Sequence, residues 1–352
     1  MALNAKKEPR ILVTRADRIG DLVLSTAVFP VIRKKYPHAR LGCLTFLENR
    51  EIVEGNPYLD EVILYDKKGA ERGFFGNLRF AWSLRKKKYD VVIHLHATNR
   101  MHFAGWLAGI PVRIGWDRRS PWALTRVYSD IKKEGKKHEA EYNFLPLESL
   151  GIECPEKLET YFPVPEKAQR SLEDLLRHFN VPQNIPIVTV NPAASDLTKM
   201  WPLGKFRELL EKMTAVYPVS VIGIGSRQDR EHVRQAAGGL PRVYDLSGHL
   251  SLAMLGALLK KSRLLISNDS GPVHIAQALG VNTVSIFVRN QPGLSPERWR
   301  PLYENARVLC GQGDDMASVP SGVKALREVT VDEVMVAAGT FLQPLTREAS
   351  RL

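Results

Sequence analysis

The sequence is poor in cysteine: its 352 residues include only Cys43, Cys154 and Cys310. These three lie far apart, so they predict neither a disulfide framework nor a structural zinc site, and they favour a reducing cytoplasm. An uncharged apolar run of about 18 residues is also missing, so no transmembrane helix is predicted. The polar N-terminus leads directly into an apolar segment, which predicts that there is no signal peptide.

Acidic residues are too few to balance the basic ones, and the formal net charge is +12. Residues 1–165 hold 28 Lys and Arg against 20 Asp and Glu, so most of the excess lies in the first half. Basic runs at 33–35, 85–88 and 132–137 favour an anionic partner, such as nucleic acid, a phospholipid surface or a phosphorylated glycan. The alternative is that they are solvated helix ends. The aromatic and basic segment 116–126 comes with no recognised RNA or DNA module, so we expect no nucleic-acid partner.

With 44% apolar and 25% charged residues, the composition is that of a soluble globular protein. Short apolar segments alternate with amphipathic ones, a pattern typical of β-strands that alternate with α-helices. The predicted strands are residues 11–14, 41–46, 62–65, 91–95, 112–114, 185–190, 219–224, 243–246, 264–267 and 283–287. The predicted helices are residues 22–35, 78–85, 100–108, 139–150, 205–216, 229–237, 252–259, 272–279 and 331–341. Residues 117–137 are predicted to form a loop.

A proline-spaced segment that ends at Pro165 interrupts this alternation and predicts a domain boundary. We therefore expect an N-terminal domain at residues 1–165 and a C-terminal domain at 166–330. The last segment, 331–352, is expected to form a helix that packs back on the N-terminal domain. The fold class is α/β, with two Rossmann-like, doubly wound domains that face each other across a cleft and bind ligands at the carboxyl ends of their strands.

The first strand-to-helix turn has the sequence Arg-Ala-Asp-Arg-Ile-Gly-Asp at positions 15–21. A dinucleotide-binding turn needs G-x-G-x-x-G, whereas only Gly20 is present, which disfavours an oxidoreductase. Asp21 either caps the following helix or acts as a general base, with Gly20 allowing close approach of a substrate. Arg18 is a candidate contact for an anionic acceptor, with a surface role as the alternative.

A second polar turn, Asn-Asp-Ser-Gly-Pro-Val-His at positions 268–274, follows the apolar run 264–266. A helix that begins at Ser270 and Gly271 presents free backbone N–H groups, which suit a phosphate. This turn therefore predicts a nucleotide or nucleotide-sugar site. After another predicted strand, at 219–224, Asp229 or Glu231 could meet a ribose hydroxyl, with an ordinary helix N-terminus as the alternative.

Other polar residues form less specific patterns. His94 and His96 alternate on one predicted strand, but a third ligand is missing nearby, so no metal site is predicted. Together with Asn99 and Arg100, which follow that strand, the two histidines are expected to line the acceptor side of the cleft, with satisfaction by hydrogen bonds as the alternative. Trp201 is expected to be a packing residue rather than a platform for a base.

Three motifs together resemble glycosyltransferase family 9, the lipopolysaccharide heptosyltransferases. They are the 15–21 turn, the segment from Asn191 to Ser195 with Lys-Met-Trp-Pro at 199–202, and the turn at 268–276, in which Ser270 stands where Thr is commoner. The chain departs from the family near its C-terminus, where many members carry several cysteines and this one has only Cys310.

This resemblance implies a GT-B fold, an inverting mechanism and ADP-heptose, or a similar nucleotide sugar, as donor. By motif match, Asp21 would be the general base, and Lys199 would help to bind the diphosphate or the acceptor. The donor site implied by the match comprises Ser195, Asp269, Ser270, Gly271 and His274, to which we add Glu231. The acceptor site would comprise Arg18, Gly20, Asn99 and Arg100.

We therefore expect an enzyme that transfers a heptose to a hydroxyl of the lipopolysaccharide inner core. Its acceptor would be an anionic lipid-linked glycan, and the protein would lie in the cytoplasm, peripheral to the inner face of the membrane. No cofactor or metal is expected, because the sequence has no Asp-x-Asp pair that would hold a divalent cation. The alternatives are a glycosyltransferase for another nucleotide sugar and a non-catalytic nucleotide-binding protein, although the presence of both Asp21 and Lys199 argues against the latter.

Overall fold

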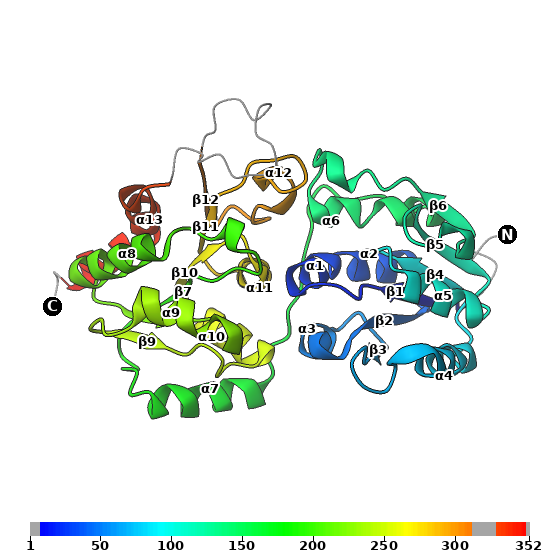
Figure 1. The fold of residues 1–352 in the computed structure, drawn as a ribbon, viewed down its shortest axis with the longest axis horizontal. Coiled ribbons are helices and arrows are strands. Elements are labelled where there is room, and N and C mark those ends of the chain that lie inside the picture. Colours follow the sequence, from blue (N-terminus) through cyan, green and yellow to red (C-terminus); the bar gives the residue numbers. More distant parts are fainter. Residues whose placement is uncertain (1–7, 312–328, 350–352) are drawn as a thin grey trace. The chain divides into compact units, whose positions relative to one another are not determined.

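The computed structural model describes residues 8–311 and 329–349, with side chains in the last helix described up to residue 343. The chain forms two compact units, Met1–Pro163 and Val164–Leu352. The division lies close to the predicted boundary at residue 165, within the proline-spaced segment. Each unit is an α/β layer structure with its own parallel six-stranded sheet (Figure 1).

The sheet of the first unit has the strand order β3-β2-β1-β4-β5-β6. Its strands are β1 Arg10–Thr14, β2 Arg40–Phe46, β3 Glu61–Tyr65, β4 Val91–His94, β5 Val112–Trp116 and β6 Arg126–Tyr128. The order reverses between the neighbouring strands β1 and β4, and such a switch point is where open α/β sheets bind ligands. The strand β6 lies within the segment predicted to be a loop. It pairs with β5 at the edge of the sheet, where its three residues remain partly exposed.

The helices of the first unit are α1 Ile19–Ser25, α2 Val28–Lys35, α3 Arg50–Val53, α4 Gly73–Lys86, α5 Asn99–Leu107 and α6 Glu139–Tyr142. Sequence analysis predicts one helix over residues 22–35, but the structure breaks it at Thr26. There the hydroxyl donates to the carbonyl of Val23 and accepts from the amide of Tyr161. Pro30 does not cause the break, because it lies in the first turn of α2, where no intrahelical donor is needed.

The sheet of the second unit has the order β12-β11-β10-β7-β8-β9, which repeats the topology of the first. Its strands are β7 Ile187–Asn191, β8 Ser220–Gly223, β9 Val243–Asp245, β10 Ser262–Asn268, β11 Thr283–Phe287 and β12 Ala306–Cys310. Its helices are α7 Glu166–His178, α8 Leu203–Val216, α9 Arg230–Ala237, α10 Leu252–Lys261, α11 Gly271–Ala278, α12 Pro296–Trp299 and α13 Val331–Ala349. The predicted set lacks β12, α7 and α12.

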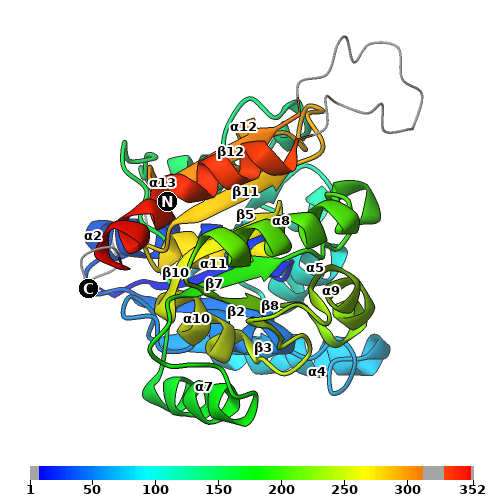
Figure 2. The same cartoon turned by 90° about the vertical axis from the view of Figure 1, so that its left-hand side faces the viewer.

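Helices cover both faces of this second sheet. On one face, α7 and α10 bury Leu172, Leu176 and Leu258 in one apolar cluster. On the other face α13 packs beside α8, as Figure 2 shows, and buries Val334 and Leu342. Sequence analysis expected the last helix to pack on the N-terminal domain. In the structure the apolar face of this helix lies in the core of the second unit, where the helix packs beside α8 and over β10.

Within residues 8–311 and 329–349, no helix combines the length and the apolar character needed to span a bilayer.

Candidate active site

Arg15 is the first residue after β1, and its guanidinium is the centre of a buried cluster of charges in the first unit. Only 1% of Arg15 is exposed. Its Nη1 donates to the carbonyl of Leu95 at 3.2 Å and to Asn143 Oδ1 at 3.0 Å. Its Nη2 donates to the carboxylates of Asp17, Asp21 and Glu139. The cluster lies where β1 and β4 end, which is the switch point of the sheet.

This charge cluster contains two cations, Arg15 and Lys132, and three carboxylates, those of Asp17, Asp21 and Glu139. Lys132 is the second cation, and its Nζ lies 2.8 Å from Glu139 Oε1 and 4.8 Å from the centre of the Trp116 ring. Glu139 is fully buried, so both cations are needed to compensate its charge. Asp17 pairs on its other side with His96, whose Nδ1 lies 3.0 Å from Oδ2. Negative charge is therefore in excess around Asp21.

The pKa of Asp21 reflects this surplus. Burial raises the pKa most strongly, and although Arg15 lowers it, the charges of Asp17 and Glu139 raise it again, to about 6. Burial would also raise the pKa of Asp17, but the hydrogen bond from His96 and the charge of Arg15 lower it to about 2. The two carboxylates thus titrate in different pH ranges. Asp21 titrates where a general base is effective, whereas Asp17 stays ionised.

The local structure of α1 excludes one of the two roles that the sequence allows for Asp21, that of the helix cap. The N-cap of α1 is Arg18, and Asp21 lies in the first turn with its side chain on Arg15, so it does not cap the helix. Its side chain keeps 13% of its surface exposed. Gly20 is buried in the same turn, while Arg18 projects into solvent. Asp21 is therefore a partly accessible carboxylate at the carboxyl edge of the sheet.

The predicted acceptor residues Asn99 and Arg100 begin α5, directly after the loop that leaves β4. Both are exposed, and Asn99 Oδ1 accepts from the hydroxyl of Ser120 at 3.0 Å. The charge of Arg100 acts on Tyr65, at the end of β3. These residues therefore lie at the carboxyl edge of the same sheet, as the sequence predicts for parallel strands.

In the second unit, β10 ends at Asn268 and α11 begins at Gly271. Ser270 is the N-cap, with its Oγ bonded to Asn191 Nδ2 at 2.9 Å and to Ser267 Oγ at 2.9 Å. Within the part of the chain that the structure describes, the amide nitrogens of Ser270 and Gly271 have no hydrogen-bond partner. This helix start therefore offers two N–H donors at the switch point between β7 and β10.

Lys199 and Asp269 lie at this same switch point. The Lys199 ammonium lies 2.5 Å from Asp269 Oδ2, with 15% and 9% of the two side chains exposed. The ion pair with Asp269, the residue before Ser270, thus holds Lys199 beside the turn at 268–271. Trp201 fixes the loop that carries Lys199, because its amide donates to Asn268 Oδ1 at 2.9 Å and its ring packs on Phe206 in the core.

Two further predicted donor residues lie in the loop after β7 and in α11. Ser195 is exposed, in the loop that leaves β7. His274 is buried in the first turn of α11, and its ring centre lies 6.5 Å from that of Trp299. Arg289 follows β11 and pairs with Asp196, beside Ser195, so it adds a cation that sequence analysis did not single out.

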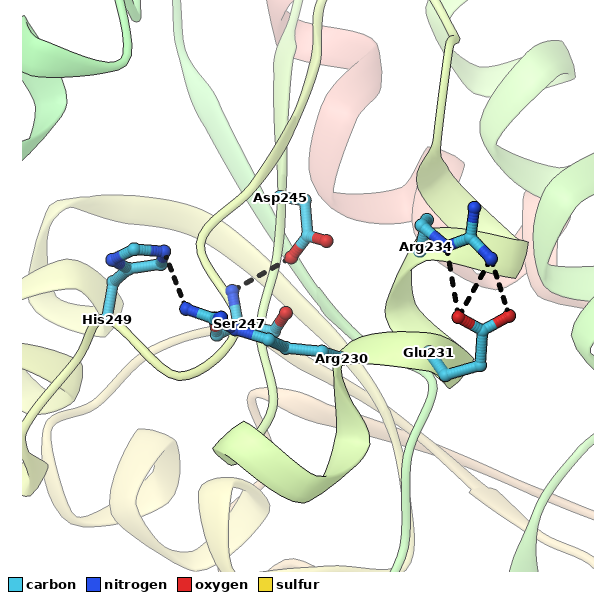
Figure 3. Close-up of a pocket in the computed structure, with 6 residues that line it drawn as sticks. All are labelled: Arg230, Glu231, Arg234, Asp245, Ser247 and His249. Carbon is cyan, nitrogen blue, oxygen red and sulfur yellow. Dashed lines mark hydrogen bonds and ion pairs between the residues drawn. The ribbon is translucent and has the colours of Figure 1, made fainter.

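A pocket of about 380 Å³ lies at the carboxyl ends of β8 and β9 in the second unit (Figure 3). It is lined by Arg230, Glu231, Arg234, Asp245, Ser247 and His249. Glu231 is exposed and paired with Arg234 at 2.8 Å, while Arg230 contacts His249 Nε2 at 3.0 Å and the carbonyl of Ser247 at 3.2 Å. The pocket and the start of α11 share one sheet edge, since all strands of this sheet are parallel.

Metal binding finds little support in these side chains. The described residues contain no group of three or more His, Cys, Asp or Glu that could hold an ion. His94, which the sequence pairs with His96, instead packs against His102, with ring centres 4.8 Å apart, and its Nδ1 is 2.9 Å from the hydroxyl of Thr14. Burial keeps the pKa of His94 well below its usual value, so this ring is neutral.

Sequence analysis missed Arg15, Lys132 and Glu139 as members of the site. Arg15 lies inside the first motif, so its position directly after a buried strand was an available signal. Lys132 and Glu139 gave no such signal, because they are distant in sequence and resemble a solvated charge run. The pocket residues Asp245 and His249 are also not predicted, although Asp245 lies near the end of a predicted strand and His249 follows that strand.

The comparisons with known proteins agree on one family. Residues 77–324 match the model of glycosyltransferase family 9 (heptosyltransferase). Lipopolysaccharide heptosyltransferase 3 of Escherichia coli is 27% identical over 297 residues, which cover 81% of this chain and 84% of that protein.

Two solved structures are similar over nearly the whole chain. The glycosyl transferase family 9 protein from Veillonella parvula matches with a TM-score of 0.85 at 24% identity and covers 98% of this chain and all of its own. The Escherichia coli heptosyltransferase WaaC with ADP-2-deoxy-2-fluoro heptose matches with a TM-score of 0.68 at 19% identity, over 94% of this chain and 99% of its own. The fold is therefore GT-B, built from two Rossmann-like units. With this fold and a family match over most of its length, the chain is a glycosyltransferase that belongs to glycosyltransferase family 9, the heptosyltransferases.

Proposed function

We propose that this enzyme transfers a heptose from ADP-heptose to a hydroxyl of the lipopolysaccharide inner core, with inversion at the anomeric carbon. The observation that carries the proposal is the partly accessible Asp21 carboxylate, whose pKa of about 6 suits a general base. In the proposed reaction this carboxylate accepts the proton of the acceptor hydroxyl. The hydroxyl oxygen forms the new bond to the anomeric carbon, and the bond to the diphosphate breaks to release ADP.

The second unit is proposed to bind the donor. Its pocket at β8 and β9 has a volume suited to a nucleoside and carries Glu231 for a ribose hydroxyl. The amides of Ser270 and Gly271, at the same sheet edge, would receive the diphosphate. Lys199 would add a full positive charge as the leaving group develops its own. These groups supply the charge that a divalent cation would otherwise supply, so we propose a metal-independent reaction.

The identity of the donor and of the acceptor rests on chemistry and similarity. A chain structurally similar to this one is solved with a fluorinated ADP-heptose, and a similar sequence is a lipopolysaccharide heptosyltransferase. The basic first unit suits an acceptor that carries carboxylates and phosphates. Such an acceptor is lipid-linked, so we further propose that the enzyme works in the cytoplasm, in peripheral contact with the inner membrane.

The test is transfer from ADP-heptose to purified truncated core acceptors, followed by mass spectrometry. We expect product with the wild-type protein and a loss of about 10²- to 10⁴-fold in rate with Asp21→Asn, because the amide cannot accept the proton. Full activity of Asp21→Asn would refute the assignment of the base. If only another nucleotide sugar supports transfer, that sugar replaces ADP-heptose as the proposed donor. If ADP binds but no acceptor receives a sugar, a non-catalytic nucleotide-binding protein is favoured.

A further inference from the structure

The helix α4 exposes large aromatic side chains on its solvent face. Phe75 is 83% exposed and Trp82 is 68% exposed. With Arg79 and Lys86 they are spaced four, three and four residues apart, which puts all four on one stripe of the helix. The stripe alternates ring and cation along the helix axis. The Lys86 ammonium lies 5.6 Å from the Trp82 ring centre, within reach of a cation–π contact.

These rings are not part of the core of the first unit. The opposite face of α4 supplies the core residues, with Phe80 and Leu84 buried in one cluster with strand residues of the sheet. A helix that is apolar on its inner face needs no rings on its outer face to stay folded. Rings exposed to this degree on a helix whose core face is already filled indicate a further partner.

The neighbouring helix α5 continues the same surface. Met101 and Ala104 of α5 are buried in the same cluster as the core face of α4, so the two helices cover one face of the sheet side by side (Figure 1). On its outer side α5 exposes 43% of Trp106, whose ring meets that of Trp122 edge to face at 5.4 Å. Trp122 itself is 62% exposed.

The charge around these rings is strongly positive. Residues 66–88 contain eight Lys and Arg against two Asp and Glu. Aromatic rings that insert at the headgroup level, with cations beside them, are the combination that holds a peripheral protein on an anionic bilayer. We propose that the outer face of α4 and α5, with Trp122, is a docking surface for an anionic phospholipid bilayer. This proposal rests on the proposed function in one respect: the docking surface would bring the enzyme to a lipid-linked acceptor.

The position of the surface suits that purpose. The helix α4 connects the carboxyl end of β3 to the start of β4, so its first turn, with Phe74 and Phe75, begins at the carboxyl edge of the sheet. Asp21 lies at this same edge, after β1. A bilayer on this face would therefore meet the first unit beside the end that carries the proposed base.

The ring geometry favours a bilayer over single-stranded nucleic acid. Base stacking needs a free ring face. Phe74 and Phe75 instead meet edge to face at 5.6 Å, and Trp106 is stacked on Phe103 with ring centres 5.7 Å apart. These four rings contact one another in pairs and the Trp82 ring contacts Lys86, so the rings do not form a row of free stacking platforms.

The experiment uses the full-length protein and sedimentation with two kinds of vesicle, one containing phosphatidylglycerol in phosphatidylcholine and one of phosphatidylcholine alone. We expect binding to the anionic vesicles that weakens as salt is raised. The double variant Arg79→Gln/Lys86→Gln should reduce the partition coefficient roughly 25-fold. The double variant Phe75→Ser/Trp82→Ser should reduce it about tenfold or more.

Matched control variants carry the same changes on exposed positions of the second unit. Val336→Ser changes a 74% exposed apolar residue, and Lys260→Gln/Lys261→Gln removes two exposed cations. Both should bind the vesicles as the wild type does. The proposal is overturned if the wild type does not prefer anionic vesicles, or if the α4 variants bind as the wild type does. It is equally overturned if the controls lose as much binding as the α4 variants.

Two further measurements separate the other outcomes. Fluorescence anisotropy with a single-stranded oligonucleotide tests for nucleic-acid binding, and sedimentation velocity without lipid tests for a dimer. The proposal is overturned if the α4 variants lose either of these and keep vesicle binding. Transfer to a deacylated, soluble acceptor should be unchanged in these variants. Vesicle binding without any transfer would leave this proposal standing and refute the proposed function, whereas transfer without vesicle binding would do the reverse.

Discussion

At the scale of single residues, the chemistry of the first unit depends on how few cations its carboxylates share. Arg15 and Lys132 are both buried, and each lies within 3.0 Å of the fully buried Glu139. Asp21 is in direct contact with Arg15, yet burial and the charges of Asp17 and Glu139 outweigh the effect of this cation on its pKa. Its raised pKa is thus a property of the whole cluster, and changing a neighbour should change the titration of this proposed base.

We predict that Asp17→Asn moves the acidic limb of the pH profile of kcat/KM to lower pH. In the wild type Asp21 is protonated below about pH 6, so activity should fall as the pH falls through that value. Asp17 stays ionised in this range and raises the pKa of Asp21 by its negative charge. Removing the charge lowers the pKa of Asp21, and activity then persists to lower pH. Steady-state kinetics between pH 4.5 and 8 would measure the shift, at roughly one pH unit or less.

Asp174→Asn is the control for this shift, because that carboxylate is exposed on α7 in the second unit. It should leave the limb where it is. A limb that stays near pH 6 in Asp17→Asn would mean that Asp17 does not act on the base.

We also predict that Lys199→Ala lowers kcat by about 100-fold, since one well-placed donor to a developing anion contributes about 3 kcal/mol. The loss would leave Asp269 buried without its cation beside the diphosphate turn. Turnover at saturating donor measures the effect, with Lys260→Ala on α10 as an exposed control. An unchanged kcat with a raised KM would instead mean that Lys199 binds the ground state and the transition state equally.

The residues of the site differ in how far a sequence reveals them. Asp21 and Lys199 follow predicted strands, where parallel sheets present their polar loops, so their chemistry is visible in the sequence. Lys132 and Glu139 belong to the site because the chain after β6 folds back to the end of β1, where Glu139 contacts both Arg15 and Lys132. Local sequence patterns do not record such a long-range contact. The pairing of Lys199 with Asp269 is likewise invisible, because it depends on the register of β7 and β10.

At the scale of elements, the buried central strands are the best predicted. The central strands are continuous apolar runs, and sequence analysis places them nearly as the structure does. The edge strands β6 and β12 are partly exposed and mix Arg with apolar residues, so their pattern is not distinct from that of a loop. The helix α7 was missed although Ala168, Leu172 and Leu176 recur every four residues and are buried.

The position of α13 gives a prediction about stability. Leu342 is fully buried between α8 and the second sheet, so Leu342→Ala should lower the free energy of unfolding of this unit by about 2–5 kcal/mol. Val336, 74% exposed on the same helix, should change it by no more than about 0.5 kcal/mol when replaced by Ala. Urea unfolding with hydrogen exchange on β7 and β10 measures both variants. Equal effects would mean that α13 does not belong to this core.

At the scale of the whole molecule, one topology is used twice for different chemistry. Both sheets reverse their strand order at the centre, between β1 and β4 and between β7 and β10. The first switch point carries a carboxylate in a cluster rich in negative charge, and the second carries a helix start and a cation. The repeated βα alternation made this architecture predictable, whereas the packing of α13 depends on tertiary contacts that no local pattern records.

We predict that ADP stabilises the protein against heat, whereas UDP, GDP and NAD do not. A ligand that binds only the native state adds about 2.7 kcal/mol at 100 times its Kd. Thermal unfolding followed by fluorescence at increasing nucleotide concentration would show the effect as a rising midpoint. Equal stabilisation by UDP would contradict the choice of an adenine nucleotide.

The strand order has a consequence for biosynthesis. The central strand β1 is made early, yet its partner β4 follows 80 residues later, as Ile11 pairs with Val91. At about 5–20 residues per second the ribosome needs roughly 4–16 s to supply it. During this interval one edge of an apolar strand is bare, and such edges recruit other chains. The nascent polypeptide, rather than the finished enzyme, is therefore the form most in need of a chaperone.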